Sequence, residues 1–267
     1  MRPLILGLTV ITLTGAVTLL TLKGQDKPGD NKQEMRVLRR SGQAEGPTEK
    51  EILDQLPIAD AFSNLPAESE KRAERQKKNA RYDKARSQDI SEADYPLGVI
   101  FNTHWSQGLP ALPIDESQVI VLAHVIDSNA YLSNDRTGIY SEFTANVKEL
   151  FKNATTSSLA NGSQVVFERL GGAVRFASGK IQTYRVSNQR MPLKGRSYVL
   201  FLKKVDDASF ALVTGYEVHG QQIRPLDGNG PGSNLPFEVY RNADVGPFIE
   251  VLRASVAKND AERNTNQ

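Results

Sequence analysis

Cysteine is absent from the 267 residues of this chain. The chain therefore cannot carry the lipidated cysteine of a bacterial lipoprotein, and it has no thiolate nucleophile. A cysteine-free domain suits an oxidising or a reducing compartment, so this absence does not decide where the chain resides. A formal net charge of +2 gives no strong overall field that would select nucleic acid or anionic lipid as a partner.

Residues that carry chemistry are also scarce. Only three histidines are present, His104, His124 and His219, and they are far apart in the sequence. No H-E-x-x-H, C-x-x-C or G-x-S-x-G motif occurs, and no phosphate-cradling glycine loop follows a strand. The segment 227–230 (DGNG) resembles the start of a calcium loop, but it lacks the glutamate at the twelfth position and is interpreted as a turn. We therefore predict no catalytic, cofactor-binding or metal-ligating residue.

The longest apolar run lies at the start of the chain, where residues 4–22 contain no charged side chain. A helix rises about 1.5 Å per residue, so these 19 residues just cross a hydrocarbon core of ~30 Å. The run is longer than the apolar core of a usual signal peptide, and no A-x-A cleavage pattern follows it. We therefore predict that residues 1–24 are a signal anchor, with secretion after cleavage as the alternative.

Charged residues on either side of this run leave its orientation open. Cytoplasmic flanks are usually rich in lysine and arginine. Arg2 precedes the run, whereas six bases diluted by three acids follow it within residues 23–40. Counted alone, these charges favour a cytoplasmic location for the chain that follows the apolar run. The few residues before the apolar run are easily retained in the cytoplasm while the rest of the chain is exported. We therefore expect the chain after residue 22 to be extracytoplasmic, either periplasmic or extracellular.

Residues 25–95 are predicted to be a charged linker or stalk. Residues 23–95 contain 15 basic and 15 acidic side chains, and their few apolar residues cannot offset the entropy of ordering. A capping box at 48–51 (TEKE) predicts a short helix that ends before Pro57. Residues 67–88 contain no glycine or proline and predict a second helix, with eight bases from residue 71 to residue 86. Because it lacks an apolar face, we expect a solvated stalk, with a basic helix on anionic lipid or RNA as the alternative.

From residue 96 onward the pattern changes to short strands, and we assign 96–258 to one β domain and 259–267 to a disordered tail. Residues 119–126 are apolar on both faces. Residues 139–151 alternate, which predicts one buried face and one solvent-exposed face that begins at Tyr140, and the two runs together predict a long hairpin. An apolar stripe from Val245 to Val256 predicts a C-terminal helix. Further strands are predicted at 165–167, 173–176, 180–186, 196–205, 209–218 and 222–226.

Several runs of the β domain carry a family resemblance. They are VIVLAHVIDSNAYLSNDRTGIYSEFTANVKELFKN, which ends at Asn153, GGAVRFASGKIQTYRV, GRSYVLFLKK and LVTGYEVHGQQIRPLDG. Over about residues 96–253 the chain resembles a family of membrane-anchored or secreted bacterial proteins with no assigned activity. This resemblance implies a β-barrel-like fold and brings no known chemistry.

A looser resemblance is to netrin-like OB barrels. The segments 121–125, 147–153 and 195–201 are similar to three strands of that family, of the types V-x-G-x-V, V-x-x-v-x-K-G and G-x-x-Y-L-v-F. Ala123 stands where a glycine is usual, and the cysteines of the inhibitory members are absent. Metalloprotease inhibition by those members needs an N-terminal cysteine, so the resemblance implies the fold without that role. The predicted fold is an antiparallel OB- or netrin-like barrel or sandwich with a C-terminal helix.

Basic residues gather in the middle of the β domain, where nine of them lie between residues 168 and 204 with a single acid. On one face they would bind an anionic partner such as a polysaccharide, a phospholipid headgroup or an acidic protein patch. Alternation along the strands could instead scatter them over several faces. Nucleic acid is not expected, because an exported domain does not meet it and no aromatic platform is evident. The candidate anion-binding residues are Arg169, Arg175, Lys180, Arg185 and Arg190.

Together these patterns predict a non-enzymatic, membrane-anchored binding or scaffold module with a protein or an envelope polysaccharide as partner. One alternative is a hydrolase with an unfamiliar site lined by Tyr131, His124 and Glu142, which requires those three side chains to converge. The other is a cytoplasm-facing module that binds anionic lipid or nucleic acid through the basic helix.

Overall fold

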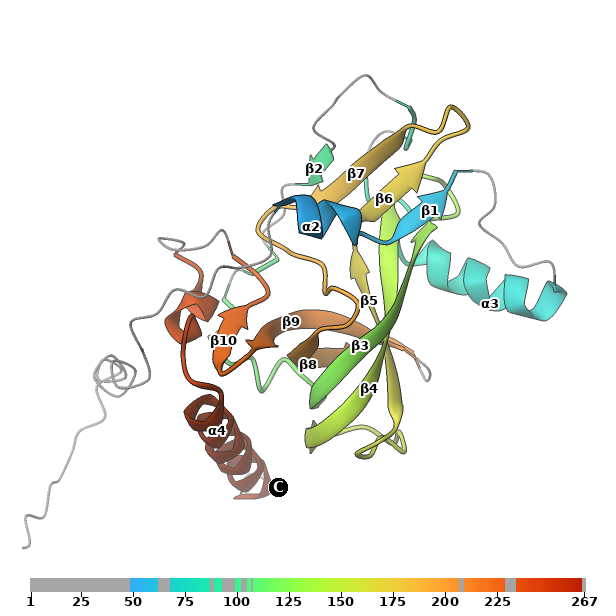
Figure 1. Ribbon diagram of the computed structural model, residues 1–267. Coiled ribbons are helices and arrows are strands. Elements are labelled where there is room, and N and C mark those ends of the chain that lie inside the picture. Colours follow the sequence, from blue (N-terminus) through green and yellow to red (C-terminus); the bar gives the residue numbers. More distant parts are fainter. Residues whose placement is uncertain are drawn as a thin grey trace, which may run out of the picture.

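The structure is a computed structural model that describes residues 49–61, 68–86, 89–92, 99–101, 105–106, 108–206, 209–228 and 234–265. The predicted anchor at 4–22 and His104 lie outside these residues. None of the described helices combines the length and the apolar character that crossing a bilayer requires. The described chain is mainly β and ends in a helix, as the sequence predicts (Figure 1).

Five strands pair in a closed circuit. β3 pairs with β4, β4 with β5, β5 with β9, β9 with β8, and β8 with β3. Every pairing is antiparallel except the one between β5 and β9. A sixth strand, β10 (Gln222–Pro225), extends the sheet beyond β9. The strands of the circuit are β3 (Val119–Leu132), β4 (Ile139–Asn153), β5 (Gln164–Leu170), β8 (Ser197–Lys204) and β9 (Phe210–His219).

The hairpin of β3 and β4 confirms the strongest prediction of the sequence. The alternation along β4 is also confirmed, since Phe143, Ala145 and Val147 are buried between more exposed neighbours. β3 continues to Leu132, past the predicted end at residue 126, because β4 supplies paired residues up to the turn. The prediction of a solvent-exposed face on β4 is wrong at Tyr140. This residue is fully buried because Tyr82, from the chain before the β domain, covers it.

Apolar runs in β8 and β3 reflect two cores, one on each side of these strands. Leu200 and Leu202 point into the circuit and belong to the same cluster as Phe143 and Phe167, whose ring centroids lie 5.2 Å apart. The intervening Phe201 packs into a second cluster on the outer side, under the C-terminal helix. A strand segment buried on both faces is apolar at successive positions, as observed at 119–123 of β3 and 198–202 of β8.

The C-terminal helix is longer than the sequence analysis expects. α4 runs over Val245–Thr265, so the predicted disordered tail at 259–267 is helical up to Thr265. Beyond the apolar stripe, Asn259 and Arg263 both donate to the Asp115 carboxylate, which ties the last turns to the β domain. A short 3-10 helix, η1 (Pro236–Tyr240), precedes α4.

A second, four-stranded sheet lies at one end of the molecule (Figure 1). Its hairpin of β6 (Gly172–Arg175) and β7 (Ile181–Val186) matches the prediction. Its outer strands, β1 (Ile58–Asp60) and β2 (Val99–Phe101), pair in parallel with β6 and β7 and were not predicted. Three residues each are too few to show a pattern in the sequence.

The charged linker is not a free stalk where the structure describes it. α2 (Glu49–Asp54) and α3 (Ser69–Ala80) confirm the two predicted helices, although α3 is shorter than 67–88. Leu56, Ala59 and Ala61 are buried in the cores of the β domain. The stalk prediction is wrong because it counted only apolar residues, whereas α3 contacts the strands through charged and tyrosine side chains.

Candidate functional site

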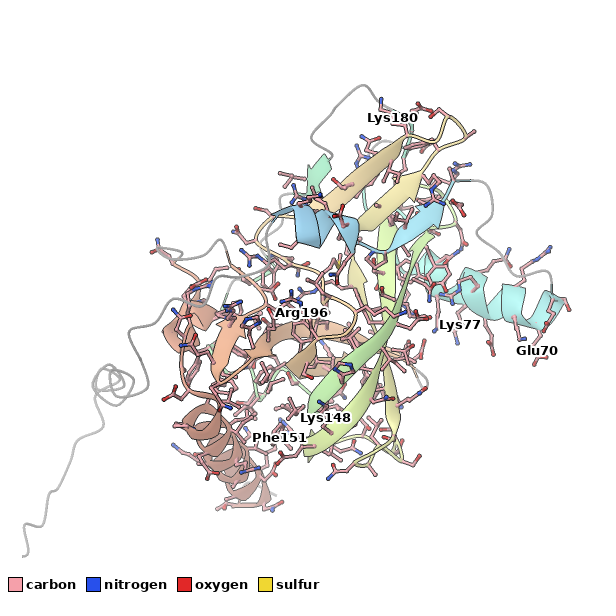
Figure 2. The ribbon with its side chains drawn as sticks, viewed as in Figure 1. Glu70, Lys77, Lys148, Phe151, Lys180 and Arg196 are labelled. Atoms are coloured by element: carbon pink, nitrogen blue, oxygen red, sulfur yellow. The ribbon has the colours of Figure 1, made fainter. Side chains whose placement is uncertain are left out.

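Three of the five candidate anion-binding residues lie apart from one another. The Arg169 side chain on β5 is only 1% exposed and is paired with Asp227, so it is not available to an external anion, contrary to the prediction. Arg175 at the end of β6 lies 3.6 Å from Asp60 on β1, with about half of each side chain exposed. Lys180 lies at the tip of the β6–β7 hairpin (Figure 2). The basic residues therefore do not form one continuous surface.

Arg185 and Arg190, in contrast, line the same pocket. This arginine pocket has a volume of about 480 Å³ and lies where α2, β2 and the segment after β7 meet. Ile52, Leu56 and Met191 contribute apolar side chains to its lining. Among the described residues that line it, none is acidic. The pocket therefore combines two guanidinium-bearing residues with an apolar wall.

A buried ion pair lies directly behind this pocket. Arg169 donates from Nη1 and Nη2 to the two carboxylate oxygens of Asp227, at 2.7 Å each. Thr214 Oγ1 donates to the same carboxylate at 2.9 Å. Two parallel hydrogen bonds between one guanidinium and one carboxylate make an arginine–carboxylate pair strong and fix its orientation. The two residues lie 58 positions apart, so no local pattern could reveal the pairing.

The ion pair holds the backbone of Arg190 from both sides. The Arg190 N–H donates to Asp227 Oδ1 at 3.0 Å, and its carbonyl oxygen accepts from Arg169 Nη1 at 2.6 Å. Neighbouring residues are held as well, since the Ser187 carbonyl accepts from Trp105 Nε1 and the Asn188 carbonyl from the Gly228 N–H. This wall of the pocket is therefore fixed before any ligand arrives.

The Arg190 side chain is the part of this residue that can meet a ligand. Both of its backbone groups are engaged, whereas its guanidinium makes no hydrogen bond or ion pair with a described residue. A guanidinium presents several N–H donors in a plane that matches carboxylate and phosphate groups. The arginine pocket can therefore hold an anionic group without chemical change at the protein.

The residues proposed for a hydrolase do not converge. His124 pairs in register with Asn146, whereas Glu142 pairs with Asn129, five residues further along β3. At ~3.3 Å per residue this separates His124 from Glu142 by roughly 16 Å along the strands, too far for proton transfer. His124 Nδ1 instead lies 3.2 Å from Ser197 Oγ. This geometry removes the support for that alternative.

The carboxylate of Glu142 is engaged by two bases of α3. Lys78 Nζ donates to Oε2 at 2.7 Å, and Arg75 donates to both oxygens at 3.3 Å. Burial alone would raise the pKa of Glu142, but the hydrogen bond from Lys78 and the charge of Arg75 outweigh it and lower the pKa below the usual 4.5. Glu168 on β5 differs, because burial raises its pKa despite the hydrogen bond from Arg81.

The lowered pKa of Glu142 and the raised pKa of Glu168 predict that the fold loses stability at acidic pH through Glu142. A lowered pKa in the folded state stabilises the fold above pH 4.5, and this contribution is lost as the pH falls below 4.5 through the lowered pKa. Glu168, with its raised pKa, contributes no such loss. Thermal unfolding between about pH 3 and pH 6 should therefore be less pH-dependent in Glu142→Gln than in the wild type. Parallel curves for the two proteins would contradict this assignment.

In the part of the chain that the structure describes, no three histidine, cysteine, aspartate or glutamate side chains are placed to hold a metal ion. Asp227, at the start of the segment that resembles a calcium loop, instead pairs with Arg169.

No protein-family model matches this chain, and no curated protein matches it. Function is therefore inferred from the geometry of the arginine pocket and of the surfaces around it.

Proposed function

We propose that the chain is a non-enzymatic, membrane-anchored binding protein that holds an anionic group of an envelope component in the arginine pocket. The observation that carries this proposal is the fixed backbone of Arg190. The buried Arg169–Asp227 pair engages both backbone groups of Arg190, which lines the pocket beside Arg185. Fixing a binding residue in advance reduces the entropy lost on binding.

The size and lining of the pocket narrow the ligand class. A volume of about 480 Å³ lies within the range of small-molecule sites, roughly 300–1,000 Å³, and suits one sugar unit or one headgroup. The guanidinium of Arg190 favours a carboxylate or phosphate, and Ile52 and Met191 favour an apolar face on the same group. An acidic sugar unit of an envelope polysaccharide meets both requirements.

We propose further that the five-strand circuit is an OB-like barrel. The support is its pairing order, β3-β4-β5-β9-β8, in which the single parallel pairing joins β5 and β9, the third and fifth of these strands along the chain. This order also agrees with the resemblance of segments 121–125, 147–153 and 195–201 to netrin-like OB barrels.

The proposed location is the cytoplasmic membrane, with residues 4–22 as a single span and the β domain outside. Fusions of alkaline phosphatase and of GFP after Gln267 test this orientation. Phosphatase activity without fluorescence is the expected result. Fluorescence without phosphatase activity would place the β domain in the cytoplasm and would contradict an envelope ligand.

The binding proposal predicts that the two pocket arginines control affinity for anions. Titration calorimetry of the full chain in detergent micelles would use trigalacturonate, glycerol phosphate and a glutamate-rich peptide as separate probes. Each charge-assisted hydrogen bond contributes about 1.5–3 kcal/mol, so Arg190→Ala and Arg185→Ala should weaken binding about 10- to 100-fold. We expect trigalacturonate to bind most tightly of the three.

Arg175→Ala is the matched control, because Arg175 belongs to the same basic series but lies outside the pocket lining. Its affinity should stay within about twofold of the wild type. Absence of binding for all three probes, or an equal loss in the Arg175 variant, would contradict the proposal.

A further inference from the structure

α3 covers an acidic and tyrosine-rich patch on the strand circuit. Besides the contacts of Arg75 and Lys78 with Glu142, Arg81 donates to Glu168 at 2.6 Å and to Asp206 at 2.8 Å. The three carboxylates come from β4, from β5 and from the turn between β8 and β9. They lie far apart in the sequence and converge only when the circuit forms.

Tyrosine side chains complete this patch. The Tyr82 ring, just after α3, stacks on Tyr140 with 4.2 Å between centroids and 10° between planes. The Arg75 guanidinium lies 3.5 Å from the centroid of Tyr131, in cation–π geometry. The Tyr140 hydroxyl donates to Asn79 Oδ1 at 2.8 Å and accepts from Arg75. We name Tyr131, Tyr140, Glu142, Glu168 and Asp206 the acidic tyrosine surface.

The contacts of α3 define a spacing along a helix. Arg75, Lys78 and Asn79 occupy positions i, i+3 and i+4 of α3, which share one helical face. Arg81 and Tyr82 lie in the turn that follows α3 and add a third base and an aromatic ring to these contacts. The opposite side of α3 points away from the β domain, as the outward positions of Glu70 and Lys77 show (Figure 2). The surface therefore distinguishes a basic helix by the spacing of its charges and one aromatic ring.

α3 is held by charge rather than by apolar burial. Its only buried residue is Asn79, and its apolar side chains are all alanine. The side chains of Arg75, Lys78 and Arg81 keep 15–24% of their surface exposed, so water and competing ions reach the ion pairs. Because α3 buries almost no apolar surface, these ion pairs are its main contacts with the strands, and salt weakens the exposed part of them. Another helix with the same charges can therefore compete for this surface.

We propose that the acidic tyrosine surface is a binding surface for a basic helix of a partner protein, and that α3 is its built-in competitor. Charge complementarity identifies the partner, since three carboxylates and two tyrosines face the helix. The partner helix carries basic residues at i and i+3, and the turn at its C-terminal end carries a third base followed by an aromatic residue. This proposal does not depend on the arginine pocket.

A peptide of residues 68–86 tests the proposal on the full chain. The variant Arg75→Gln/Lys78→Gln/Arg81→Gln weakens the attachment of α3 and frees the surface. Fluorescence anisotropy should show that the peptide binds this variant at least about tenfold more tightly than it binds the wild type, whose own α3 competes. Affinity should fall as ionic strength rises.

Two variants on the same strand locate the binding site. In the triple-variant background, Glu142→Gln should reduce peptide affinity about tenfold or more. Glu149→Gln is the matched control, because Glu149 also lies on β4 but pairs with Arg253 of α4. No preference of the peptide for a folded triple variant, or an equal effect of the two substitutions, would overturn the proposal.

A measurement on the chain with α3 intact covers the case in which the triple variant does not fold. Because the chain contains no cysteine, Ala80→Cys at the exposed end of α3 takes a single fluorescent label. Excess peptide at low salt should displace α3 and change the label's emission with saturation. A label that does not respond would overturn the proposal.

Discussion

Replacing Asp227 with asparagine is expected to lower the free energy of unfolding by about 3–5 kcal/mol, because the Arg169 charge then remains buried without its counter-charge. The Arg169 side chain is 1% exposed and the Asp227 side chain 0%, so water cannot replace the lost carboxylate. Urea unfolding followed by circular dichroism measures the loss. Anion affinity should fall as well, since an amide nitrogen in place of Oδ2 would face Arg169 Nη2 and disturb the arginine that donates to the Arg190 carbonyl.

Two controls separate the buried charge from a general effect of substitution. Asp60→Asn removes the partner of Arg175 in a half-exposed pair, and it should cost no more than about 1 kcal/mol. Arg169→Met/Asp227→Leu removes both charges and should regain much of the stability that Asp227→Asn loses. Its anion affinity should remain low, because the Arg190 backbone stays without partners. Equal losses for Asp227→Asn and Asp60→Asn would contradict the structural role of the ion pair.

Gly138→Val is expected to push the chain after α3 away from the strand circuit. A Cβ atom at residue 138 would lie 2.3 Å from the Tyr82 carbonyl oxygen and 3.0 Å from the Ala85 Cβ. Relief of such a clash costs about 1–3 kcal/mol, and the fold can relieve this one by releasing residues 81–86. Trypsin should therefore cleave after Arg81, Lys84 or Arg86 about tenfold faster or more, as mass spectrometry of early digests would show.

Gly246→Ala is the matched control for this substitution. No atom lies within 4 Å of a Cβ at residue 246, and the backbone there needs no left-handed conformation. The control should be cleaved at the wild-type rate. If Gly138→Val is also cleaved at that rate, the segment 81–86 is not held against the β3–β4 turn in solution.

The strands of the circuit could be predicted because their signals are local. β4 alternates, and β8 is apolar from Tyr198 to Leu202 because it has a core on each side there. β1 and β2 were missed since each has three residues and pairs with strands far along the chain. The end of α4 was missed because its last turns are held by Asp115, a contact that an apolar stripe does not reveal.

The sequence indicated some of the residues that line the arginine pocket. Two residues of the charge pattern, Arg185 and Arg190, line one pocket, and their binding of an anion stays a prediction. The charge pattern could not separate them from Arg169, because the sequence does not show that Asp227 lies against β5. Nor could it show that α2 supplies the apolar wall through Ile52. The docking of α3 was missed for a similar reason, since its carboxylate partners gather from three separate elements.

The central claim is that the arginine pocket binds an anion, and a crystal structure of the full chain grown with selenate tests it most directly. Selenium scatters anomalously, so the bound anion can be located without reference to the protein. We predict a peak within hydrogen-bonding distance of the Arg190 guanidinium and beside Arg185, which disappears in Arg190→Ala. Peaks confined to exposed bases such as Arg175 and Lys180, with an empty pocket, would contradict the claim.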